Sequence, residues 1–306
     1  MTSPKINRNE DGNQAAEPAH PFYITREEEH RLRIAAETLS PALVIDQASS
    51  FDEYTRQLMV PPAVMDLKRK AEHMRLAAWE VQGIRRLLEP TPPGGEDRLL
   101  RHILKAKAEK DDSHPPYIRV ACTGKGDFDD QVVRHGYVAD VPEEQNIGSP
   151  VVLEIWPAQH FSPMHSHGNT TGIIYCLAGQ LDVMSYEELD WDAEKRGLVT
   201  LTPGRCAWLS GSQYAVHKVY CPLDGGPAWQ KDDLLNDTGD FAASFHVYLN
   251  EDETGMDEVV PGPMSRNEFE YIEEKFPHDH NWFETHSDLS WKVLRAALAD
   301  EMRNLS

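Results

Sequence analysis

The sequence has no long apolar run, no dense cysteine pattern and no basic start. No stretch approaches the roughly 20 apolar residues that span a bilayer, and the polar, proline-bearing N-terminus does not have the form of a signal peptide. The four cysteines form no C-x-x-C pair and lie mostly in apolar surroundings, as free thiols do in a reducing compartment. We therefore predict a soluble, cytoplasmic protein.

Positive charge is also scarce. The chain has 30 basic and 51 acidic residues and a formal net charge of −21. Because like charges repel at long range, this balance argues against nucleic acid or an anionic membrane as a partner. We expect a small-molecule partner, with the protein either a monomer or a homo-oligomer formed through its helices.

Residue patterns divide the chain into four regions. Residues 1–22 are polar and are expected to be disordered. Residues 23–110 show helical periodicity, residues 111–250 show short apolar runs separated by Gly and Asp turns, and residues 251–306 form an acidic loop followed by a helical tail. This order predicts a helical N-terminal layer, a central β-barrel and a helical C-terminal tail.

Individual elements follow from caps and breakers. Helices are expected to start near Thr25 and Ser50, where the side chains can cap the first turn. Further helices are expected over 63–88, 96–107, 266–275 and 288–302. In the central region, 116–121 and 131–133 are interpreted as strands, and 241–249 alternates well as another.

A possible metal site lies between two apolar β runs. His165 and His167 form an H-x-H pair, and residues i and i+2 of an extended strand point to the same side. His217 lies in another β-type run and is the natural third ligand for a divalent metal. A second pair, His278 and His280, lies in a stretch rich in Pro, Asp and Asn that is expected to be a loop, and it is interpreted as solvated.

The expected acidic ligand is missing from this pattern. Gly172 stands five residues after His167, and the next acidic residue is Asp182. Three neutral imidazoles suit iron with anionic co-ligands, and they also suit zinc that activates water. The ligand types alone leave both metals open.

A second polar pattern lies on a later strand. Ser244, His246 and Tyr248 alternate with apolar residues and therefore share one face. A hydroxyl, an imidazole and a phenol in a row can form a hydrogen-bonded relay that orients the phenol toward a ligand. The alternative is an amphipathic strand whose polar face meets solvent.

Taken together, these motifs carry a resemblance. Trp156, the H-F-S-P-M-H-S-H run (160–167), the C-A-W-L and H-K-V runs, and S-F-H-V-Y (244–248) occur in the order found in cysteine dioxygenase. The chain thus resembles the thiol dioxygenases of the cupin superfamily over residues 115 to 250. The resemblance implies a mainly-β fold, the cupin double-stranded β-helix (jelly-roll) barrel, with a helical N-terminal extension and a helical C-terminal tail.

The resemblance also implies a reaction. A small thiol and O2 would be converted to a sulfinic acid by one Fe(II) per chain, held by His165, His167 and His217. Tyr248 would contact the substrate or oxygen, with His246 and Ser244 orienting it.

Substrate-binding residues follow from the same resemblance. The carboxylate-binding arginine of the family lies in a Y-x-R sequence, which Tyr117 and Arg119 match. A guanidinium suits a carboxylate, and Arg134 is the rival candidate. Trp156 completes the expected substrate-binding set.

Departures from the family leave the substrate open. Gly172 stands where animal cysteine dioxygenases have the cysteine that is linked to tyrosine, so Tyr248 is expected to be free of that link. Leu249 and Asn250 follow it in place of Ser-Pro-Pro. Cysteine or a related carboxylated thiol is the first expectation. The alternatives are a cysteamine-like thiol or a heterocyclic thiol or thione, a non-catalytic metal-binding sensor, and a zinc or manganese isomerase or hydrolase.

Overall fold

The structure is a computed structural model, and it describes most of the chain. The described residues are 20–91, 94–111, 114–122, 124–139, 151–224, 239–250, 268–273, 276–284 and 287–304. Most of the segment expected to be disordered, up to residue 19, and most of the acidic loop after residue 250 lie outside them. In the described part of the chain, no helix combines the length and apolar character that a bilayer crossing needs.

Eight consecutive strands build the barrel. They are β3 (Val151–Pro157), β4 (Met164–Ser166), β5 (Thr170–Ala178), β6 (Leu181–Tyr186), β7 (Lys195–Leu201), β8 (Cys206–Leu209), β9 (Val216–Tyr220) and β10 (Phe241–Asn250). Their antiparallel pairs are nested: β6 with β7, β5 with β8, β4 with β9, and β3 with β10.

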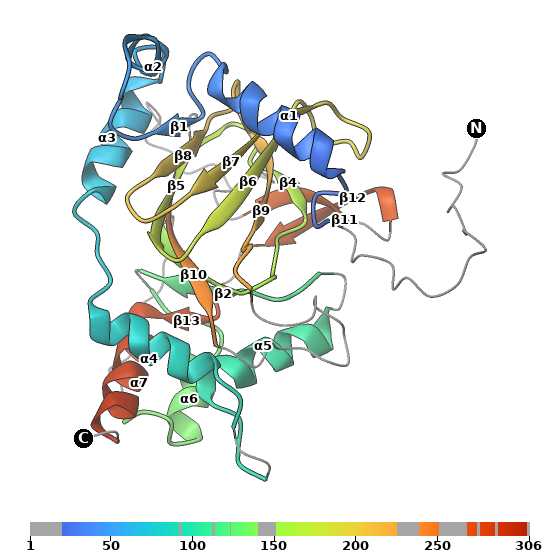
Figure 1. Ribbon diagram of the computed structural model, residues 1–306. Coiled ribbons are helices and arrows are strands. Elements are labelled where there is room, and N and C mark those ends of the chain that lie inside the picture. Colours follow the sequence, from blue (N-terminus) through green and yellow to red (C-terminus); the bar gives the residue numbers. More distant parts are fainter. Residues whose placement is uncertain are drawn as a thin grey trace, which may run out of the picture.

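This nesting describes one long antiparallel ribbon that is rolled up. Successive pairs fall alternately into two sheets, which contain the orders β8-β5-β10-β3 and β4-β9-β6-β7. Such an arrangement is the jelly roll, or double-stranded β-helix. The fold is therefore the mainly-β barrel expected from the sequence, with helices before and after it (Figure 1).

Strands from outside the eight extend both sheets. The first sheet gains β1 (Val44–Ile45), β2 (Ile118–Ala121) and β13 (Leu289–Ser290), and the second gains β11 (Glu268–Glu273) and β12 (Phe276–Glu284). The helix expected over 266–275 is thus wrong. Its residues form β11 because they pair with β4 on one side and β12 on the other, and such tertiary pairing overrides weak local preference.

The helices are α1 (Arg26–Glu37), α2 (Phe51–Gln57), α3 (Pro62–Ala71), α4 (Ala78–Leu88), α5 (Leu99–Lys110), α6 (Asp129–Arg134) and α7 (Trp291–Arg303). Thr25 caps α1 by accepting from the backbone N–H of Glu28, and Ser50 caps α2 in a capping box with Glu53. Both predicted helix starts are confirmed.

Three other expectations about helices need correction. Residues 63–88 form two helices, because Arg75 donates to the carbonyls of Glu72 and Met74 and so ends the first of them. The strand expected at 131–133 is part of α6, whose first turn carries acidic side chains that favour a helix start. The last helix begins later than expected and is capped by Ser290.

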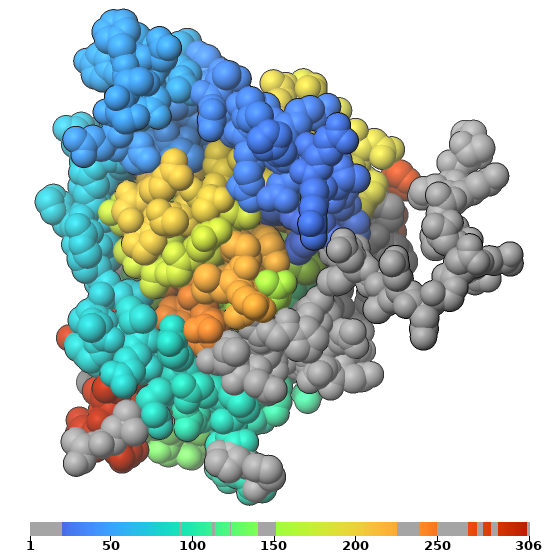
Figure 2. Space-filling model, in the orientation of Figure 1, coloured from blue at the N-terminus to red at the C-terminus, as the bar shows by residue number. Residues whose placement is uncertain are grey.

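The helices cover the barrel from different sides. Helix α1 lies across β7, where Gly197 permits the contact: a Cβ at this position would lie 3.1 Å from the Cα of Ala36. Helices α4, α5 and α7 pack with the first sheet in the largest apolar cluster, which includes Leu100, Ile155 and Leu298. Figure 2 shows the blue and cyan helical residues bordering the yellow strands.

Candidate metal centre

The structure brings the three predicted histidines together inside the barrel. His165 on β4 lies directly opposite His217 on β9 in the strand register. His167 follows at the end of β4, where its backbone N–H donates to Ala215 O at 3.1 Å. One ring nitrogen of each imidazole lies within 4.8 Å of a ring nitrogen of the other two.

All three imidazoles are held in the neutral form. Burial lowers the pKa of His165 to about 4, and burial together with the neighbouring histidines lowers the pKa of His167 and His217 well below the ordinary value. The Nδ1 of His165 donates to the carbonyl of Pro163 at 3.0 Å, which leaves Nε2 as the lone-pair nitrogen. Neutral imidazoles oriented in this way are the form that binds metal ions.

His167 provides a direct test of whether a metal fits. Both of its ring nitrogens are buried and have no hydrogen-bond partner in the described chain. Leaving such atoms unsatisfied is costly, and a metal ion would satisfy the lone pair. Aromatic rings of Phe269 and Tyr248 pack against the imidazole at centroid distances of 4.0 and 4.8 Å, so the residues fit a divalent metal.

The predicted relay on β10 faces the same pocket. Trp156 Nε1 donates to Ser244 Oγ at 2.9 Å, and Ser244 Oγ lies 2.7 Å from His246 Nε2. His246 Nδ1 lies 2.8 Å from the hydroxyl of Tyr248. The relay residues are at most 4% exposed, so the alternative of a solvent-facing strand is wrong.

A buried carboxylate that the sequence reasoning missed joins this relay. Glu154 on β3 lies opposite Ser244; its Oε2 accepts from His246 Nε2 at 3.0 Å and its Oε1 lies 3.2 Å from Arg119 Nη1. Burial alone would raise the pKa of this carboxyl, but His246 and Arg119 hold the pKa at about 2. The signal was an acidic residue in an otherwise apolar strand, on the face that also carries Trp156.

Glu154 also fixes one proton of the relay. A carboxylate only accepts hydrogen bonds, so Nε2 of His246 carries a proton and donates to Glu154. The other ring nitrogen, Nδ1, lies within hydrogen-bond distance of the Tyr248 hydroxyl. Burial and the charge of Glu154 raise the pKa of Tyr248 well above the ordinary value, so this hydroxyl stays protonated.

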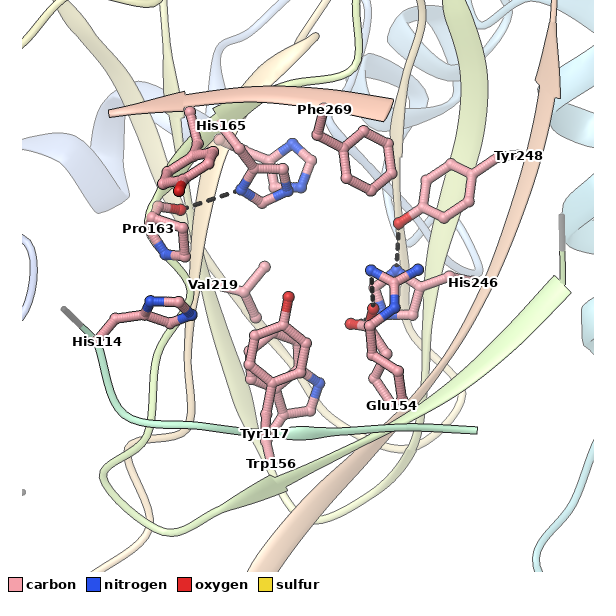
Figure 3. A pocket seen from close by; sticks show the side chains of 13 residues that line it. His114, Tyr117, Glu154, Trp156, Pro163, His165, Val219, His246, Tyr248 and Phe269 are labelled. Atoms are coloured by element: carbon pink, nitrogen blue, oxygen red, sulfur yellow. Dashed lines mark hydrogen bonds and ion pairs between the residues drawn. The ribbon is translucent and has the colours of Figure 1, made fainter. Parts of the chain in front are cut away.

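The expected substrate-binding residues line the pocket, with one exception. Arg119 on β2 lies opposite Glu154 in register, and Tyr117 stacks on Trp156 with ring centroids 4.0 Å apart. The side chains of Arg119, Tyr117, Glu154 and Trp156 all line the cavity, and Figure 3 labels the last three. The rival Arg134 lies on α6 and is not among the residues that line it.

The C-terminal region closes one side of the site, which the sequence reasoning did not foresee. Phe269 and Tyr271 of β11 line the pocket, and Figure 3 shows this strand crossing the top of the view, with Phe269 and His165 below it. The pocket has a cavity volume of about 30 Å³. This space accommodates a ligand of a few atoms rather than a large cofactor.

Gly172 is explained by the ring of Tyr248, which lies opposite it in the strand register. A Cβ on residue 172 would lie 2.7 Å from Cδ1 of that ring and 2.9 Å from the backbone oxygen of Val247. A side chain at this position would therefore displace the tyrosine, and glycine offers no atom for a covalent link.

The second H-x-H pair has a different environment. His278 and His280 lie on β12 rather than in a loop, and both are exposed. His280 Nδ1 is paired with Glu270 at 2.8 Å. Among the described residues, the cluster with metal-ligand geometry is that of His165, His167 and His217.

No protein-family model and no curated protein sequence matches this chain. Similar solved structures include the Drosophila melanogaster CENP-C cupin domain, with 8% identity over 35% of this chain and 65% of that one and a TM-score of 0.25. Recombinant oxalate oxidase in complex with glycolate has 15% identity over 34% and 43%, with a TM-score of 0.24. A Klebsiella pneumoniae protein with a double-stranded β-helix domain has 14% identity over 33% and 62%, with a TM-score of 0.23.

The chain spans less than two thirds of the length of each of these three proteins. The likeness is too low to say anything about activity, and the fold rests on the strand order itself. The strand order and the site together define a double-stranded β-helix with a three-histidine cluster able to hold a metal.

Proposed function

We propose that the protein is a non-haem Fe(II) thiol dioxygenase that converts a small thiol and O2 to the sulfinic acid. The observation that carries the proposal is the meeting, in one small pocket, of a carboxylate-free histidine cluster with the buried relay ending at Tyr248. Sulfur and oxygen ligands suit an open site on a metal held by neutral imidazoles. When bound, the iron would supply the binding and activation of thiolate and O2.

The chain's own residues have distinct roles in this proposal. His165, His167 and His217 would hold the metal. The hydroxyl of Tyr248 is held 2.8 Å from His246 Nδ1, which would orient it toward the substrate or the bound oxygen. Ser244 and Glu154 contact Nε2 of His246 and so fix the orientation of its ring.

The walls of the pocket keep water away from the reacting atoms. Trp156, Phe269 and Tyr248 are each at most 5% exposed, and Tyr117 stacks on the tryptophan. A dry pocket strengthens every polar contact made inside it.

The test is oxygen uptake by the Fe(II)-loaded protein with a panel of thiols. The panel contains cysteine, 3-mercaptopropionate, 3-mercaptopropionamide, cysteamine and a heterocyclic thione, and mass spectrometry detects the sulfinate. One O2 consumed for each sulfinate formed is the expected result. Bound iron with no uptake on any thiol would contradict the proposal and favour a metal-binding sensor.

Tyr248→Phe separates the relay from the metal site. The variant keeps the ring against His167 but removes the hydroxyl, so we expect turnover to fall about 100-fold with the iron content unchanged. Loss of iron in this variant would mean that Tyr248 supports the metal site rather than the reaction.

A further inference from the structure

The pocket holds a guanidinium and a carboxylate, and they are paired with each other. Arg119 Nη1 and Glu154 Oε1 are 3.2 Å apart, and both side chains are at most 5% exposed. The pair is fixed by the sheet, because the two residues lie opposite each other on β2 and β3. The resemblance alone would give the guanidinium to a substrate carboxylate, but here a carboxylate of the protein already occupies it.

The charge of the pocket changes accordingly. Arg119 alone would add one positive charge beside the histidine cluster, whereas Arg119 and Glu154 together add none. A substrate carboxylate at this place would be the second carboxylate on one guanidinium. In a buried pocket the repulsion between two like charges is large, because little water screens them.

Glu154 is also occupied on its other side. Oε2 accepts from His246 Nε2 at 3.0 Å while Oε1 is held by Arg119. Both oxygens of Glu154 already have a donor, and the guanidinium beside them repels a substrate ammonium group. The paired residues thus form a binding place neither for an anion nor for a cation.

An uncharged hydrogen-bond acceptor on the substrate, in contrast, fits the donors of Arg119 that Glu154 does not use. The Nε of Arg119 is buried and has no hydrogen-bond partner in the described part of the chain. The guanidinium lines the cavity, and a carbonyl or hydroxyl oxygen can accept from one of its N–H groups without adding charge. The aromatic rings of Tyr117, Trp156 and Phe269 line the same cavity, and they suit the apolar part of a small molecule.

We infer that the substrate of this pocket is a small thiol whose remaining part is uncharged and carries one hydrogen-bond acceptor, with Glu154 as the residue that excludes carboxylated thiols. The inference deepens the proposed function and rests on it for the sulfur chemistry. It favours a thiol without a carboxylate over cysteine, which the resemblance puts first.

A charge series tests this inference by binding alone. The Fe(II)-loaded full chain is titrated calorimetrically without oxygen with 3-mercaptopropionamide, 3-mercaptopropionate and cysteamine. The first two share one carbon frame and differ in charge, whereas cysteamine is cationic and has no carbonyl acceptor. The wild type is expected to bind the amide at least about tenfold more tightly than either charged thiol. Glu154→Gln should shift the preference to 3-mercaptopropionate, and Arg119→Gln should shift it to cysteamine.

Two further variants keep the test decisive. The double variant Arg119→Gln, Glu154→Gln restores a neutral pocket and should again prefer the amide, even if a single variant with an unpaired charge does not fold. Asp182→Asn is the matched control, because Asp182 is also a buried carboxylate paired with an arginine, Arg33, at 2.9 Å, and it does not line the pocket. It should keep the wild-type order of affinities.

The outcomes separate this inference from the proposed function. A wild type that binds 3-mercaptopropionate most tightly, a Glu154→Gln variant with unchanged order, or no binding of any thiol would overturn the inference. The expected order of binding, without sulfinate in parallel aerobic reactions, would support the inference and overturn the dioxygenase proposal. Sulfinate formed fastest from 3-mercaptopropionate would support the dioxygenase proposal and overturn the inference about the substrate.

Discussion

The molecule contains the same short motif twice on one sheet, with opposite results. His165 and His167 belong to β4, His278 and His280 belong to β12, and β11 lies between the two strands. The first pair points into the barrel, is neutral and meets a third imidazole. The second pair is exposed, and His280 pairs with a surface carboxylate, Glu270.

The difference shows what an H-x-H spacing does and does not determine. The spacing puts two imidazoles on one face of a strand in both cases. Which face that is, and whether a third ligand lies across from it, depends on the strand register, which here places His217 opposite His165. Burial then keeps the inner imidazoles neutral.

Removal of the third ligand, His217, should have the largest effect, because it should abolish the metal binding that distinguishes the inner histidine pair from the exposed one. His217→Ala leaves two imidazoles, so metal affinity is expected to fall more than about 100-fold. Elemental analysis after dialysis measures the retained metal. His280→Ala is the control and should keep the wild-type metal content; equal losses in the two variants would contradict the assignment of the site.

The second-largest effect is expected from truncating Phe269, the side chain of β11 that packs inside the barrel. Phe269 packs on His167 and is 5% exposed, whereas Trp282 on neighbouring β12 is 56% exposed. Phe269→Ala is expected to lower the free energy of unfolding by about 3 kcal/mol. Trp282→Ala should cost less than about 0.5 kcal/mol. Urea denaturation of both variants measures the difference, and similar losses would refute it.

Acid should reveal the neutral state of the inner imidazoles. In metal-free protein, an unfolded histidine takes up a proton at about pH 6.5, while burial lowers the pKa of folded His165 to about 4. The unfolded chain therefore binds more protons between these pH values, and stability falls as the pH falls through this window.

The contribution of one such histidine is up to about 1.4 kcal/mol per pH unit. His165→Gln should flatten the stability profile by this amount between pH 6.5 and 4. Above pH 7 its profile should run parallel to that of the wild type. Denaturant titrations of chelator-treated protein at several pH values check this, and parallel profiles throughout would contradict it.

The exposed pair should show the smallest effect. Glu270→Gln removes the partner of His280, whose side chain is 42% exposed. Because exposed ion pairs are weak, the free energy of unfolding should fall by about 0.5 kcal/mol or less. Thermal unfolding measures the change, and a loss of several degrees would show that the pair supports β11 against β12.

The sequence alone predicted side chains that share a face within one strand, and it added His217 on a second strand as the third ligand; Tyr117, Arg119 and Trp156 came from the family resemblance. His165 with His167, and Ser244 with His246 and Tyr248, follow from the alternation of side chains along an extended chain. The barrel itself followed from short apolar runs separated by turns. Such local rules need no knowledge of which strands are neighbours.

The parts that could not be predicted depend on neighbours distant in sequence. Glu154 meets Arg119 only because β3 pairs with β2 in one particular register, and a sequence pattern does not contain that register. Likewise, the sequence pattern of the β11 residues predicts a short helix, and their pairing with β4 makes them a strand. The break near Arg75 depends on a side chain folding back on two carbonyls.

The position of β11 also limits where the chain can be shortened. The family resemblance ends at Asn250, yet β4 is flanked by β9 on one side and by β11 on the other. A fragment that ends at residue 250 would turn β4 into an edge strand, with unpaired backbone groups beside His165. Edge strands are templates for pairing with other chains, so the bare barrel should self-associate more readily than the full chain.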